Sequence, residues 1–61
     1  MNNETLTIEV ISLRPSNVIV LVLVITDPQK IMDWYRYALA QVPVIRDLLE
    51  LRFHFGHTNW D

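Results

Sequence analysis

The stretch Val18–Pro28, with the sequence VIVLVLVITDP, decides the fold. All of its residues from Val18 to Ile25 are apolar and most are β-branched, which predicts a strand rather than a helix. A strand that is apolar at every position is typical of one covered on both faces. The run is also far shorter than the roughly 20 residues of a membrane-spanning helix. We therefore expect a buried strand in a soluble protein, with the cytoplasm as its default location.

The end of this stretch predicts the start of a helix. Asp27 can accept hydrogen bonds from the free N–H groups of a first turn, and Pro28 suits the first helical position because its missing N–H costs nothing there. Beyond it, apolar residues recur at spacings of three and four. This stripe comprises Ile31, Trp34, Tyr35, Ala38, Val42, Ile45, Leu49 and Phe53. Pro43 interrupts the stripe, so we expect a kinked helix, or two stacked ones, with the break near Val42.

Upstream of the apolar run, residues 6–13 alternate between apolar and polar side chains, which predicts a half-buried strand. Its expected core face is formed by Leu6, Ile8 and Val10. Residues 14–17, with the sequence RPSN, predict a type I turn in which Pro15 takes the second position, and Asn17 tolerates the left-handed conformation that often closes such a hairpin. The chain therefore begins with a β-hairpin.

The C-terminal part of the chain allows two interpretations. Residues 51–55 alternate between apolar and polar, so they form either a short third strand or the fraying end of the helix. Gly56 is placed to end either one. The fold class is α+β, as ββα or ββαβ, in a single domain of residues 1–61. We expect residues 1–4 and 57–61 to be loosely ordered tails.

The size and composition of the chain predict self-association. A folded monomer of 7.2 kDa keeps roughly 4,100 Å² of the about 10,400 Å² that its extended chain exposes, and so buries only about 60%. Hydrophobic residues make up 51% of the chain and charged residues only 20%. The chain has no cysteine, so no disulfide can compensate for a small core. We expect an obligate homo-oligomer, joined by an intermolecular sheet through the open edge of the second strand, by face-to-face hairpins or by helix packing.

Composition also excludes several classes of function. The acidic residues are spread out, so no two carboxylates form a general acid–base pair. A single glycine excludes a glycine-rich phosphate loop, and neither Ser12 nor Ser16 has the sequence context of a nucleophile. We therefore expect no enzyme and no cofactor. The net charge is −2 and the five basic residues are scattered, which disfavours nucleic acid as a partner.

The sequence Trp34-Tyr35-Arg36-Tyr37 is rich in the residue types that anchor protein interfaces. The alternative is structural: Trp34 lies in the core, Tyr35 lies in the core or at a subunit interface, and Arg36 pairs with Asp33. Tyr37 lies off the apolar stripe and should be exposed. The predicted partner-binding residues are Arg36, Tyr37, Phe55 and Trp60.

Two histidines near the end of the chain predict a weak metal site. His54 and His57, together with Asp61, form an H-x-x-H…D pattern that can ligate zinc, most readily at a junction between subunits. The competing interpretation is a partly exposed segment with ordinary hydrogen bonds. Our leading hypothesis is a non-enzymatic accessory, adaptor or inhibitor subunit that binds itself and another protein. The alternatives are a metal- or ligand-binding oligomer and a dimeric hairpin that binds nucleic acid.

Overall fold

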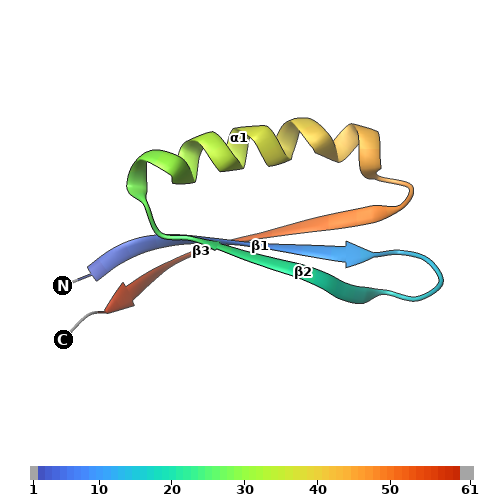
Figure 1. The fold of residues 1–61 in the computed structure, drawn as a ribbon, viewed down its shortest axis with the longest axis horizontal. Helices are drawn as coiled ribbons and strands as arrows, with labels where there is room; N and C mark the ends of the chain where they lie inside the picture. Colours follow the sequence, from blue (N-terminus) through green and yellow to red (C-terminus); the bar gives the residue numbers. More distant parts are fainter. Residues whose placement is uncertain (1, 60–61) are drawn as a thin grey trace.

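The protein has three strands and one helix, in the order ββαβ. The structure, a computed structural model, describes the backbone of residues 2–59 and the side chains of residues 4–57. Its elements are β1 (Asn2–Ser12), β2 (Val18–Ile25), α1 (Pro28–Ile45) and β3 (Leu49–Asn59). The strands form one antiparallel sheet in the order β2-β1-β3, and α1 lies along one of its faces (Figure 1). The predicted α+β class is confirmed, and the alternative with a third strand is the observed one.

The first strand is the centre of the sheet. β1 pairs with β3 along its whole length, from Asn2 opposite Asn59 to Ser12 opposite Leu49. Strand pairing therefore includes residues 2–4 and 57–59, which the sequence predicts as loose tails. The predicted strand at 51–55 extends at both ends, because the pairing with β1 continues beyond the alternating residues.

The helix is shorter than its apolar stripe suggests. The sequence places Leu49 and Phe53 on the helix, but α1 ends at Ile45 and both residues belong to β3. Leu49 and Phe53 are four residues apart, which fits one face of a helix and also one face of a strand. Pro43 lies in the last turn, where its missing N–H removes a helical hydrogen bond just before the end. α1 continues through Pro43 without a break.

The predicted start of α1 is confirmed. Asp27 is the N-cap, and its Oδ1 accepts a hydrogen bond of 3.0 Å from the backbone N–H of Gln29. Pro28 is the first helical residue. Within residues 2–59 no helix combines the length and apolarity needed to cross a bilayer.

The core lies between α1 and the face of the sheet beneath it, here called the helix face. Leu6 and Ile8 of β1 point to this face and are 0% and 2% exposed. They pack with Ile31 and Ala38 of α1. Around this centre lies a ring of partly buried side chains, formed by Leu23, Ile25, Tyr35, Leu51 and Phe53. The predicted core face of the first strand is therefore confirmed at its two most buried positions.

The hairpin between β1 and β2 is irregular. The Arg14–Pro15 peptide bond is cis, and no residue of the described part has a positive φ. Asn17 therefore does not adopt the left-handed conformation that the sequence allows at the end of this turn. The register between β1 and β2 shifts by one residue near the start of β2. Val10 lies opposite Leu21 but Ile11 lies opposite Ile19, so Val20 is the extra residue of a bulge.

Core packing gives a first prediction. Leu6→Ala should lower the free energy of unfolding by about 2–5 kcal/mol, because a fully buried leucine leaves a cavity between α1 and β1. Urea unfolding followed by circular dichroism measures the change. The matched control is Met32→Ala on α1, whose side chain is 51% exposed and should change stability by no more than about 0.5 kcal/mol. Equal effects of the two variants would contradict the assigned core.

Candidate interaction surface

β2 is the most apolar element of the chain and lies at an edge of the sheet. Leu21, on the helix face, is 49% exposed because α1 packs over β1 and β3 rather than over β2. Val24, on the opposite or open face, is 61% exposed. The sequence predicts a strand covered on both faces, but within a single chain both faces of β2 remain accessible.

The side of α1 nearer to β2 is also apolar and exposed. Tyr35 points toward β3, where its ring packs edge-on against Phe53 and Phe55 at centroid distances of 5.2 and 5.3 Å. Successive helical residues are about 100° apart, so Trp34 and Tyr37 lie on the other side of α1, toward β2. Their rings meet edge to face at 6.1 Å and line a shallow hollow with Asp33.

Of the three aromatic residues of α1, one is more exposed than the sequence predicts. Trp34 is 39% exposed, so its assignment to the core is wrong. Tyr35 is partly buried, and the predicted exposure of Tyr37 is confirmed at 62%. The sequence pattern assigns Trp34 to the stripe correctly, but the stripe is wider than the contact that α1 makes with the sheet.

The four predicted partner-binding residues do not form one patch. Arg36 is exposed beside Tyr37 on α1, and no ion pair joins it to Asp33 among the described residues. Phe55 is 61% exposed on β3, at the other edge of the sheet from β2. Trp60 lies outside the described residues.

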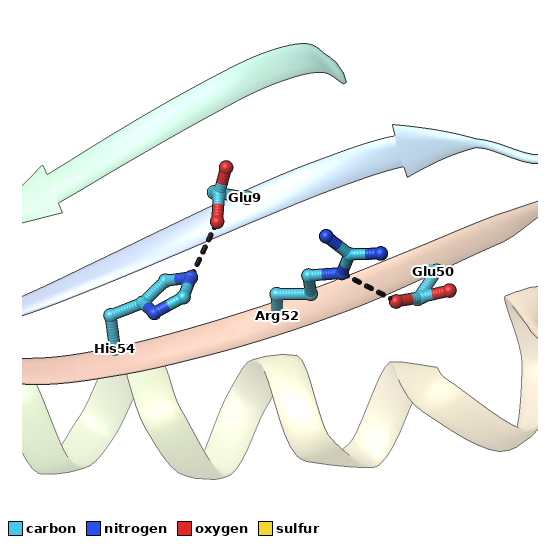
Figure 2. A network of polar contacts seen from close by, with 4 residues as sticks. All are labelled: Glu9, Glu50, Arg52 and His54. Atoms are coloured by element: carbon cyan, nitrogen blue, oxygen red, sulfur yellow. Dashed lines mark hydrogen bonds and ion pairs between the residues drawn. The ribbon is translucent and has the colours of Figure 1, made fainter. Parts of the chain in front are cut away.

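The open face carries charge on its β1–β3 half. We call this group the charged strip, and it consists of Glu9, Glu50, Arg52 and His54 (Figure 2). Arg52 Nε donates a hydrogen bond of 2.7 Å to Glu50 Oε2, and this bond and the glutamate charge raise the pKa of Arg52. His54 Nε2 contacts Glu9 Oε1 across the two strands. The alternation of residues 50–54 signals that three of these side chains share a face, but Glu9 joins them only through the register of β1 and β3.

The predicted metal residues are not brought together within one chain. His54 and His57 are three positions apart on β3, so they point to opposite faces of the sheet. Asp61 lies outside the described residues. Within the described part, no three potential ligands (histidine or acidic side chains) gather at one point. A metal site between subunits stays a prediction.

The contact between Glu9 and His54 should contribute little to stability. The His54 side chain is 56% exposed and that of Glu9 is 21% exposed, so water screens the pair. A double-mutant cycle with Glu9→Gln and His54→Gln should give a coupling of about 0–1 kcal/mol in urea unfolding. The coupling should shrink further in about 1 M salt. A coupling well above this range would contradict the description of the pair as solvent-screened.

The chain thus presents two contrasting surfaces. One is apolar and extends from β2 to the neighbouring side of α1, and the other is the charged strip. None of the described polar or charged residues is buried, so neither surface holds a charged group that is shielded from water. Comparison of the chain with protein-family models, with curated proteins and with solved structures gives no match.

Proposed function

We propose that this protein is a non-enzymatic interaction module whose working form is an oligomer. The observation that carries the proposal is the amount of apolar side chain left exposed by a single chain. The exposed large hydrophobic residues are Val18, Ile19, Val20, Leu21, Val22, Val24, Met32, Trp34, Tyr37, Leu39, Val44, Leu48 and Phe55. Nearly half of them belong to β2. Those of β2 lie side by side along one exposed strand, and an exposed apolar strip of this kind is typical of a site that another chain covers.

The accessible surface supports the same proposal. The single chain exposes 4806 Å², which is about 700 Å² more than the roughly 4,100 Å² that a folded monomer of this mass keeps. The excess is close to the about 800 Å² that each partner buries in a standard protein interface. Its origin is the flat shape of the chain, whose Cα atoms span 42 × 21 × 12 Å.

The polar residues fit binding better than catalysis. Enzyme sites hold charged groups in desolvated pockets, where burial shifts their pKa values toward the operating pH. The charged strip lies instead on the accessible, open face of a sheet. Its charges are of both signs, unlike the basic surface that phosphate backbones require. We place this binding function in the cytoplasm, as the sequence suggests.

We propose that a second protein binds at the exposed surface of α1, so that this chain acts as an accessory, adaptor or inhibitor subunit. Trp34 and Tyr37 form an aromatic hollow together with Asp33, and Arg36, the residue before Tyr37, is exposed. Tryptophan, tyrosine and arginine are the residue types that most often dominate binding energy at interfaces. Phe55 lies on β3, at the other edge of the sheet from β2, so it does not belong to the same contact.

Self-association gives the first test of this function. Light scattering on a sizing column should give a mass of at least twice 7.2 kDa that stays constant on dilution, because separated chains would expose the apolar surface of β2. A well-folded monomer at every concentration would overturn the proposal.

The binding of a second protein gives the next test. Tyr37→Ala should reduce the capture of proteins from the native cell, because it removes half of the aromatic hollow. Met32→Ala, on the opposite side of α1 and similarly exposed, is the matched control and should capture as the wild type does. Unchanged capture by Tyr37→Ala would show that α1 does not bind through this hollow.

A further inference from the structure

β2 has a free edge whose backbone groups can be assigned. The N–H of Leu13 donates to the carbonyl of Leu48 at 2.9 Å, one step beyond the last pair of β1 and β3. Along an antiparallel strand, the residues direct their N–H and C=O groups alternately to one neighbour and the other. Odd-numbered residues of β1 therefore turn toward β3 and even-numbered ones toward β2. By the register of β1 and β2, Val22 and Val24 turn their backbone groups away from β1, to the free edge.

We propose that β2 pairs along this edge with β2 of a second copy of the chain, antiparallel, in a sheet of the order β3-β1-β2-β2-β1-β3. This inference rests on the proposed self-association and names the surface responsible for it. Val20 is displaced by the bulge, so the regular part of the edge is residues 21–25. Centring the two-fold axis on Leu23 uses all of this part and sets Val22 opposite Val24 of the second copy.

The distribution of charge favours a second copy as the occupant of this edge. β2 carries no charged side chain, so two copies can meet there without repulsion or loss of ion hydration. β3, the other edge, carries Glu50, Arg52 and His54, and charged side chains discourage edge-to-edge pairing. The assembly therefore stops at two chains, because each chain has only one edge that can pair and the two-fold axis uses both.

The same axis sets the exposed sides of the two α1 helices facing each other across a groove. Antiparallel pairing at an edge requires an axis perpendicular to the sheet, which leaves both helices on one face. With strands about 4.8 Å apart, the two helix axes lie about 19 Å apart over the joined sheet, roughly twice the distance of packed helices. Trp34 and Tyr37 of each copy face this space, and Leu21 and Leu23 form its floor. Pairing through β2 thus places both exposed apolar regions, β2 and the neighbouring side of α1, next to the interface between the two copies.

Disulfide cross-linking tests the pairing directly, since the natural chain has no cysteine. A Val22→Cys chain is mixed with a Val24→Cys chain under mild oxidation. Random pairing puts one chain of each kind in about half of the dimers, and these should convert to a covalent species of twice 7.2 kDa, seen by non-reducing electrophoresis. The control mixture replaces Val22→Cys with Arg52→Cys. Val22 and Arg52 both lie opposite Glu9, in one row on the same face but at opposite edges, and this mixture should stay uncoupled.

The outcome separates this inference from the proposed function. A wild-type dimer by light scattering, with no more cross-linking in the test mixture than in the control, would overturn pairing through β2 and leave self-association intact. A wild-type monomer would overturn both.

A charge at the free edge provides an independent measurement. Val22→Lys should reduce the mass to that of one chain while circular dichroism retains the fold, because the side chain at this position is already 49% exposed. Arg52→Ala, at the far edge, should leave the dimer mass unchanged. A Val22→Lys protein that remains a dimer would count against the pairing.

Discussion

The width of one helix constrains the rest of this structure. An α-helix with its side chains is about 10–12 Å across, and strands lie about 4.8 Å apart, so α1 can cover two strands but not three. It packs over β1 and β3, so β2 is covered only at Leu23 and Ile25, which reach the edge of the core. β2 is the element that can least tolerate exposure, since it has no polar residue between Val18 and Ile25. The accessible apolar surface follows from this mismatch between a single helix and a three-stranded sheet.

Local chemistry in the sequence predicts the elements well, whereas their placement depends on contacts between distant residues. Asp27 and Pro28 identify the start of α1, and the alternation after Thr5 identifies β1. The extent of β3 is not predictable in this way, because Leu49 and Phe53 satisfy both a helical and a strand period. Only the register with β1, set from the opposite end of the chain, decides between them.

The candidate interaction surface also contains some residues whose placement the sequence predicts and others whose placement it does not. The exposure of Tyr37 follows from its position off the apolar stripe, so the sequence predicts it. The exposure of Trp34 does not, because it depends on α1 turning Tyr35 toward Phe53 and Phe55 of β3. The charged strip is likewise a product of register, since Glu9 and His54 are brought together from different ends of the chain. Residues that contact each other across strands are far apart in the sequence, so no local sequence pattern identifies them.

The central position of β1 has a consequence for how the protein is made. β1 is synthesised before its two neighbours, and β3 follows it only after β2 and α1 have been made. Until β3 docks, the nascent hairpin has two unpaired edges and no helix held against its apolar face, because α1 packs on β1 and β3 together. Partly made chains carry the aggregation hazard that exposed apolar strands bring. Pairing between residues so far apart in sequence also slows folding, which lengthens the time for which the hairpin of a new chain stays uncovered.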